Sequence, residues 1–204
     1  MKHRYLLTLF TAACAGGALG QSRLEDSTKP RGMDGPIAVG AWLSPRIDLE
    51  LAGSGAPAMS MRSARPDVLE AKDDRLVGVA PGVSAVLITT DDGTVLDFVH
   101  LWVVAPTRVE LEVLDSERNR RGGIDDTIEL LVGESLYLAP VVYAGTQELA
   151  GTAAAEWHAD AGIVDLLKDG EPSRRRIVAR APGKTTVAVK MLGMESSFDL
   201  VVAR

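Results

Sequence analysis

The sequence is poor in the side chains that disulfide bonding, metal binding and catalysis use. Cys14 is the single cysteine, and there are three histidines among 204 residues. One cysteine excludes an intramolecular disulfide, so a folded domain of this chain must be held by packing alone. Only 4% of the residues are aromatic. The core must therefore be built from Val, Leu, Ile and Ala, side chains that suit thin β-sandwiches.

Two further absences narrow the class of protein. No stretch approaches the about 20 apolar residues of a membrane-spanning helix, and no segment of ten or more residues has the apolar period of a helix. The formal net charge is −6, so counterion release would add little to nucleic-acid binding, which we therefore do not expect. With 46% hydrophobic and 25% charged residues, the composition is that of a globular protein.

The N-terminus has the pattern of an export signal. Two basic residues precede the apolar run at 5–13, as in secretory signal peptides. Cys14 directly follows this run and resembles the lipobox of bacterial lipoproteins, although Thr11 stands where that motif usually has Leu. The alternatives are cleavage after Gly20 and a cysteine that lies in the signal by chance. We expect residues 1–20 to be a signal peptide of the lipoprotein type, with cleavage before Cys14 and acylation of this residue, which would hold the protein at a membrane.

A segment without apolar periodicity follows the signal. Residues 21–35 mix Gly, Ser, Asp, Lys and Pro, which is the composition of a flexible linker. We expect this segment to tether the anchored end to the folded part of the chain.

The rest of the chain contains an internal repeat. Residues 77–88 (VGVAPGVSAVLI) and 178–189 (VARAPGKTTVAV) both place Ala-Pro-Gly between an apolar stretch and an alternating run. Upstream, residues 37–51 and 129–143 both contain Val-Gly followed by an alternating strand. Short strands separated by frequent turns are typical of a sandwich or barrel. The sequence therefore predicts an all-β fold.

The Ala-Pro-Gly motif has a physical reason of its own. Pro81 and Pro182 end the preceding strand, because proline fixes φ and lacks an amide donor. Gly82 and Gly183 accept positive φ and let the chain reverse tightly. We interpret these four residues as elements of the fold and not as a ligand loop.

In their order, these motifs resemble the bacterial immunoglobulin-like group 2 (BIG2) family. Residues 75–82 (RLVGVAPG) and 176–183 (RIVARAPG) match its strand and Pro-Gly segment. Trp157 stands where the family often has a core tryptophan. The resemblance implies two immunoglobulin-like β-sandwich domains in tandem, at residues 36–105 and 106–204. It also implies a bacterial surface or adhesion protein.

No catalytic or metal-binding motif is recognisable. His100 and His158 fall in different predicted domains, without the spacing of a metal site, and we expect no metal and no cofactor. There is no Gly-x-Ser-x-Gly elbow, Walker loop or Gly-x-Gly-x-x-Gly motif, so we expect no catalytic residue. The acidic pairs at 73–74, 91–92 and 125–126 lie in predicted turns, where solvation is a simpler reading than calcium binding.

Two short basic patches, at residues 118–121 and 174–176, are interpreted as solvated loops, and residues 121–123 as a turn. The strand Val95 to Val104 is largely apolar, and Asp97 and His100 are its polar residues. We expect it to be an extended edge that pairs with a strand of a partner.

We consider three hypotheses about function. The first is a noncatalytic exported envelope or surface protein that presents immunoglobulin-like domains to a protein or glycan, or acts as a spacer. The second is an accessory lipoprotein subunit of an envelope assembly. The third is a hydrolase with a cryptic site, and the missing catalytic motifs argue against it. The expected location is the outer membrane or cell surface, with a membrane contact through the lipid anchor. The alternative is a periplasmic or secreted protein.

Overall fold

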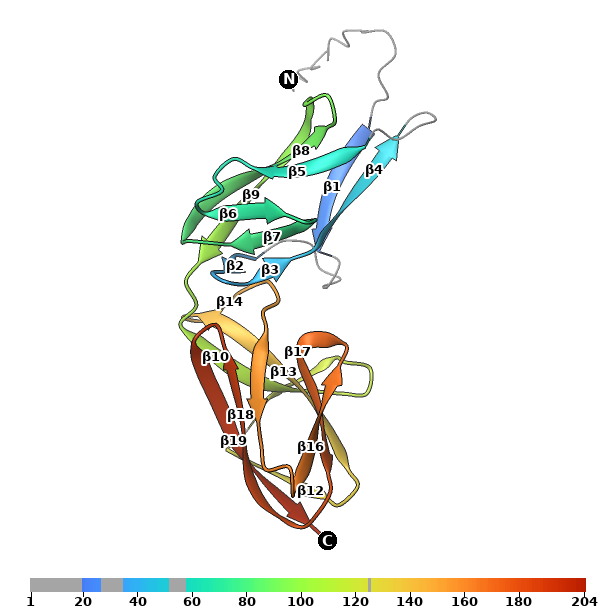
Figure 1. Ribbon diagram of the computed structural model, residues 1–204, viewed down its shortest axis with the longest axis vertical. Coiled ribbons are helices and arrows are strands. Elements are labelled where there is room, and N and C mark those ends of the chain that lie inside the picture. The colour runs from blue at the N-terminus through green and yellow to red at the C-terminus, as the bar shows by residue number, and fades with distance from the viewer. Residues whose placement is uncertain (1–19, 27–34, 52–57, 125) are drawn as a thin grey trace, which may run out of the picture.

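The computed structural model describes residues 20–26, 35–51, 58–124 and 126–204 of the chain. All the regular secondary structure in these ranges is β-strand. These ranges contain no helix that is long and apolar enough to cross a membrane. The strands form an elongated molecule with the C-terminus at one end (Figure 1). The expected signal peptide and Cys14 lie outside the described residues.

The first repeat, residues 20–104, contains two groups of strands. One group is a sheet with the strand order β2-β9-β8-β5; the other consists of the sheet β3-β7-β6 and the ribbon β1-β4. The strand bounds are β1 Gly20–Asp26, β2 Ile37–Ala38, β3 Trp42–Leu43, β4 Pro45–Leu51, β5 Met59–Ser63, β6 Leu69–Lys72, β7 Arg75–Gly78, β8 Gly82–Thr90 and β9 Val95–Val104.

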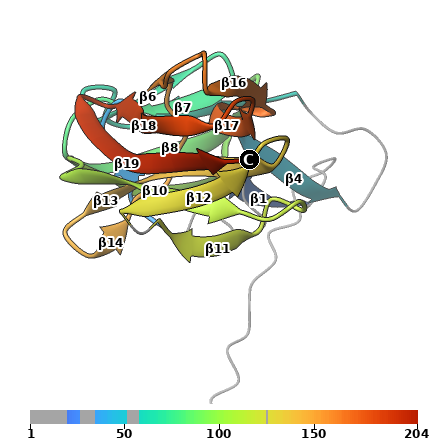
Figure 2. The ribbon, with the colours of Figure 1, turned by 90° about the horizontal axis from the view of Figure 1, so that it is seen from below.

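The second repeat, residues 108–203, has the same plan. One sheet has the order β12-β19-β18-β15 and the other the order β11-β10-β13-β17-β16, with β14 beside β13. Figure 2, viewed from the C-terminal end, shows β12 and β19 side by side. The bounds are β10 Arg108–Leu114, β11 Arg120–Gly123, β12 Thr127–Leu131, β13 Ser135–Ala144, β14 Gln147–Glu148, β15 Ala155–His158, β16 Val164–Asp169, β17 Glu171–Ala179, β18 Gly183–Met191 and β19 Met194–Ala203.

The two repeats share one plan, although β11 and β14 of the second repeat have no counterpart in the first. β2 pairs with β9 in parallel, as β12 does with β19, and β1 pairs with β4 antiparallel, as β10 does with β13. Each repeat thus has strand pairings of the kind found in immunoglobulin-like sandwiches. The predicted fold class and the internal repeat are therefore confirmed, whereas the division into two domains at residue 105 stays a prediction.

The Val-Gly turns of the two repeats share their hydrogen bonds. The turn amides of Gly40 and Gly133 donate at 2.8 Å to the carbonyls of Gly78 and Ala179, respectively. Both glycines have positive φ, at 82° and 91°, the conformation that glycine adopts at little cost. In the second repeat, the amide of Leu131 also donates to the Glu134 carboxylate at 2.8 Å.

The Ala-Pro-Gly segments also have a common structure. Gly82 lies against Val68, whose Cγ2 is 3.1 Å from the place of a Cβ atom, and Gly183 lies against Ile163, whose Cδ1 is 3.0 Å from that place. φ is positive at Gly82, at 156°, but no positive φ is found at Gly183. Close approach of a neighbouring side chain, rather than a positive φ, is therefore the shared reason for glycine here.

Alternation along the strands buries one face of each sheet. In β18, Thr185, Val187 and Val189 are buried, as their spacing in the sequence predicted. The core of the second repeat contains ten buried residues: Leu111, Leu138, Val164, Ile177, Ala179, Val187, Val189, Phe198, Leu200 and Val202. Complete burial of one such aliphatic side chain contributes about 1.5–3 kcal/mol.

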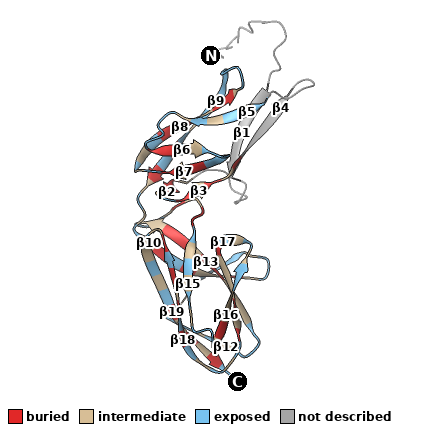
Figure 3. Ribbon diagram, viewed as in Figure 1, coloured by how far each residue is buried: buried red, intermediate tan, exposed pale blue. Residues whose placement is uncertain are grey.

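The core of the first repeat continues across the junction. Its fully buried members include Leu43 and Leu76, and it also contains Val142, Leu149 and Met191 of the second repeat. Buried positions accordingly run through both repeats and the region between them (Figure 3). The repeats therefore share apolar surface that neither could bury alone.

Backbone hydrogen bonds join the two repeats as well. Trp42 and Thr152 each donate an amide to the other's carbonyl at 2.8 Å, and Ala38 donates to Ala150 at 3.1 Å. The amide of Ala150 donates in turn to Pro36 at 2.7 Å. Such strand-like pairing fixes both distance and orientation, so the junction is a structured interface and not a hinge.

Three expectations from the sequence are wrong. Residues 20–26 form β1, paired with β4, so the linker expected at 21–35 is wrong at its start, and residues 27–34 lie outside the described residues. With few apolar residues, GQSRLED gives no periodic signal. Residues 121–123 belong to β11 and not to a turn, and 174–176 lie within β17 and not in a loop.

Candidate binding surfaces

The outer face of β8 and β9 is apolar although it lies at the surface. On the inner face, Val86 is 0% exposed and Leu101 2%. On the outer face, Phe98 is 57% exposed and Trp102 56%. Strands with two apolar faces are usually covered on both, whereas a strand with one solvated face alternates with polar residues. This face therefore has the composition of a covered surface.

The register of the two strands defines this surface. Three pairs lie directly opposite one another on the outer face: Val83 with Trp102, Ala85 with His100 and Leu87 with Phe98. We call these six residues the β8–β9 face. The rings of Phe98 and His100 meet edge to face with their centroids 5.5 Å apart. None of the six is a lysine, an arginine or a carboxylate, so the face carries no fixed charge.

The second repeat shows what the fold itself requires at these positions. The equivalent pairs are Lys184 with Val201, Thr186 with Asp199 and Ala188 with Ser197.

This equivalent face is charged and internally paired. Lys184 Nζ lies 2.8 Å from Asp199 Oδ2, and the Thr186 hydroxyl donates to Asp199 Oδ1 at 3.0 Å. The Lys184 ammonium, followed by the Thr186 hydroxyl, holds the pKa of Asp199 below its ordinary value. Because the same fold accepts a polar face there, the apolar residues of the β8–β9 face are not needed for folding.

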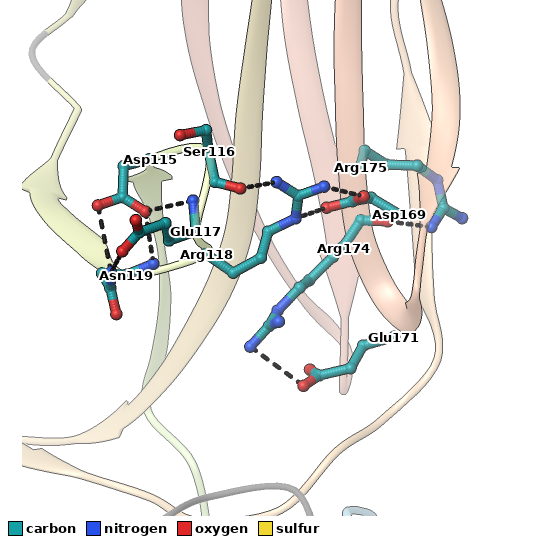
Figure 4. Close-up of polar contacts among 9 residues, drawn as sticks. All are labelled: Asp115, Ser116, Glu117, Arg118, Asn119, Asp169, Glu171, Arg174 and Arg175. Carbon is teal, nitrogen blue, oxygen red and sulfur yellow. Dashed lines mark hydrogen bonds and ion pairs between the residues drawn. The ribbon is translucent and has the colours of Figure 1, made fainter.

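A second surface, on β10, β11, β13 and β17, gathers arginines, tyrosines and carboxylates. The guanidinium of Arg118 stacks 3.8 Å from the ring centre of Tyr137 and forms an ion pair with Asp169, with 2.6 Å between Nε and Oδ2. Figure 4 shows how Arg118 reaches from the β10–β11 turn to Asp169 at the end of β16. The hydrogen bond to Asp169 raises the pKa of Arg118 above its ordinary value.

The same turn is held by a second carboxylate. Asp115 accepts the amides of Glu117 and Asn119, both at 2.9 Å. These bonds, that of Asn119 first, lower the pKa of Asp115. Residues 118–121 are therefore not a free basic loop, because their charges are used to fix the turn.

The remaining arginines of this surface also have partners. Arg120 donates to both oxygens of Glu148 at 2.7 Å. Arg174 pairs with Glu171 at 3.0 Å, and Arg175 donates to the carbonyl of Pro172 at the same distance. A surface whose cations are already neutralised by carboxylates and carbonyls is a weak candidate for binding an anion.

The structure places the other residues singled out in the sequence as follows. Trp157 is half-buried against the second core and donates Nε1 to the carbonyl of Ser173 at 2.9 Å. His100 and His158 lie on β9 and β15, in different repeats. Within the described ranges, no three His, Cys, Asp or Glu side chains are placed to hold a metal ion.

The strand Val95 to Val104 was expected to be an edge strand of its sheet, and this is wrong because β9 has a neighbouring strand on each side. β9 pairs with β8 along its length and with β2 at Val103 and Val104. Alternation then places its aromatic residues on an outer face. The signal in the sequence was the largely apolar composition of residues 95–104, which is compatible with two apolar faces as well as with an edge.

Comparison with solved structures finds bacterial surface proteins. The chain is similar to domains 4 and 5 of the S-layer protein SbsC, with 13% identity and a TM-score of 0.36 over 93% of this chain and 100% of that one. It covers 28% of a longer fragment of that S-layer protein. It is also similar to invasin, a bacterial integrin-binding protein, with 16% identity and a TM-score of 0.33 over 89% of this chain and 40% of that one.

A further similar structure is the Yersinia pseudotuberculosis adhesin InvE, with 11% identity and a TM-score of 0.33 over 90% of this chain and 59% of that one. No protein-family model matches the chain, and no curated protein matches its sequence. The resemblance to the BIG2 family stays a prediction, and none of these values transfers a role to this chain.

Proposed function

We propose that this chain is a noncatalytic protein of the bacterial envelope that is exported, is anchored through Cys14 and acts by binding a partner. Its two immunoglobulin-like repeats form one rigid, elongated unit, which we call the post, and its β8–β9 face binds the partner. The observation that carries the proposal is this face, where Phe98 and Trp102 are more than half exposed. The second repeat has Ser197 at the position of Phe98 and the smaller Val201 at the position of Trp102.

The junction supports the role of a post. The paired amides of Trp42 and Thr152 and the continuous core stiffen the link between the repeats. A flexible linker between them would let the second repeat fold back toward the anchor, whereas a fixed junction keeps it at a distance.

The position of β1 supports an anchor at one end of the post. Gly20 pairs with Leu51 and Asp26 with Pro45, so Gly20 lies at the end of the ribbon remote from the junction. Only five residues lie between Cys14 and Gly20, so the two are at most about 22 Å apart along an extended chain. An acylated Cys14 would therefore hold the first repeat close to the membrane and direct the second away from it.

The alternative is a fixed subunit of an envelope assembly, in which the same face is permanently covered by another component. The charge-free composition of the face favours this alternative as well. The two differ in whether the protein is found alone or always with another component.

Cell fractionation of the native protein and of Cys14→Ala tests the anchor. We expect the native protein in membranes and the variant either unprocessed or soluble. Protease treatment of intact cells then reports whether the repeats face outward. Soluble native and variant proteins that both start near Gln21 would contradict the anchor and leave a secreted or periplasmic protein.

A further inference from the structure

The β8–β9 face has the properties of a surface that meets its own copy. We propose that two copies of this chain associate through their β8–β9 faces, sheet against sheet and with the posts parallel. The inference names the partner of the surface on which the proposed function rests. Its contact residues are Val83, Leu87, Phe98, His100 and Trp102.

The absence of fixed charge favours a like partner. A charged face opposed to itself brings like charges together, which disfavours association. On the outer face of β8 and β9, by contrast, the cross-strand pairs carry no charge: Val83 lies opposite Trp102 and Leu87 opposite Phe98. Two such faces can be brought together without burying an unpaired ion.

The exposed area fits the centre of an interface. Phe98 and Trp102 are 57% and 56% exposed, and Val83 is 37% exposed. Each of the two aromatic side chains therefore offers roughly 100 Å² of surface. A standard interface takes about 800 Å² from each partner, with an apolar core inside a polar rim. The β8–β9 face supplies that core. Arg62, exposed on the neighbouring edge strand β5 and opposite Leu87, is the charged residue that borders it.

The side chains do not favour a glycan. A sugar needs several hydrogen-bonding groups beside the aromatic platform, and the six residues of the face offer only the His100 imidazole and the Trp102 indole N–H. Sheet faces pack on each other about 10 Å apart through interdigitating apolar side chains. The face offers this kind of contact.

Anchoring fixes the orientation of the pair. Two copies in one membrane must keep both Gly20 ends, and hence both Cys14 residues, on the same side. A two-fold axis along the posts satisfies this condition for faces in contact, whereas an axis across the posts would send the anchors in opposite directions. The pair is therefore parallel, and each second repeat points away from the membrane.

The test exchanges the face for its counterpart in the second repeat. The variant Val83→Lys/Phe98→Ser/His100→Asp introduces the residue types of Lys184, Ser197 and Asp199, which the same fold already holds. Trp102→Ala is the milder variant, and Ser197→Lys in the second repeat is the matched control. Sedimentation velocity of the full-length protein, purified in mild detergent from the cell fraction that contains it, measures association over a range of concentrations.

We expect the native protein and Ser197→Lys to form dimers, the triple variant to be monomeric and Trp102→Ala to associate about 30-fold more weakly or worse. Circular dichroism checks that each variant is folded. A native protein that stays monomeric at every concentration would overturn the inference. So would a triple variant that still dimerises, or a native monomer that binds a different protein or a glycan through Trp102. Membrane location is scored in the same preparations, so an anchored monomer refutes only the dimer and a soluble dimer refutes only the anchor.

Discussion

Gly151, at the junction between the repeats, gives the sharpest test of how tightly they are joined. Its φ is +105°, and a Cβ atom there would lie 2.9 Å from Ala41 Cβ and 3.4 Å from the Trp42 carbonyl oxygen. The variant Gly151→Ala therefore adds both backbone strain and a clash with atoms that cannot rotate away. Gly133→Ala is the matched control, because its φ is +91° and nothing lies within 4 Å of its Cβ position.

The magnitude follows from separating the two effects. A non-glycine residue in the left-handed region costs about 1–2 kcal/mol, and both variants incur this cost. Overpacking adds about 1–3 kcal/mol, and only Gly151→Ala incurs it. We expect the free energy of unfolding to fall by about 2–5 kcal/mol for Gly151→Ala and by about 1–2 kcal/mol for the control.

Urea unfolding followed by circular dichroism and tryptophan fluorescence measures both values. Hydrogen exchange at the Trp42 and Thr152 amides, which bond to each other's carbonyls, locates the damage. Faster exchange there in Gly151→Ala alone would place the loss at the junction. Equal free energies for Gly151→Ala and Gly133→Ala would refute the tight junction, because strain alone would then explain both.

Three further predictions concern the second repeat. Lys184→Ala should raise the pKa of Asp199 toward its ordinary value of 3.8, as measured by carbon NMR titration. Because that pKa is depressed in the folded state, the carboxylate stabilises the fold above pH 3.8 and this contribution disappears as the pH falls through the lower folded value; equal acid stability of variant and native protein would contradict this. Trp157→Phe leaves the Ser173 carbonyl without its donor and should cost about 1–3 kcal/mol in thermal unfolding, whereas an unchanged melting temperature would count against the bond. Leu200→Ala, at a side chain that is 0% exposed, should cost about 2–5 kcal/mol in urea unfolding, and a loss below 1 kcal/mol would argue against that burial.

The repeat was predictable because its signals are local. Ala-Pro-Gly and Val-Gly occur twice in the same order, and each motif needs glycine for a contact or a φ that the structure shows. Alternation in β18 and β19 is regular, so the buried set Val187, Val189, Leu200 and Val202 follows from the period of two.

What escaped prediction depends on contacts between segments distant in the sequence. β1 has no alternating apolar residues and is defined by its pairing with β4. The strand that contains Arg174 resembled a loop because three consecutive arginines have no apolar face. In the structure, Arg174 forms an ion pair with Glu171 and Arg175 donates a hydrogen bond to a backbone carbonyl. The junction left no signal at all, because small residues such as Ala41 and Gly151 say nothing of what approaches them.

The sequence predicted the composition of the candidate surface but not its position in the sheet. The largely apolar segment from Val95 to Val104 indicated a contact surface, but an edge and a face give the same composition. Only the register, with Trp102 opposite Val83, shows that these side chains lie on one face of the sheet.

Glu134 makes the far end of the second repeat different from the far end of the first. In the first repeat, the amide of Ala38 binds Ala150 of the following repeat, whereas in the second repeat the equivalent amide, that of Leu131, is taken by the Glu134 side chain. Another immunoglobulin-like unit stacking on this end would have to displace that carboxylate and bury its charge, which is costly without a new partner. Repeating junctions left open at one end invite filaments, and the bond from Leu131 to the Glu134 carboxylate disfavours such stacking on this end.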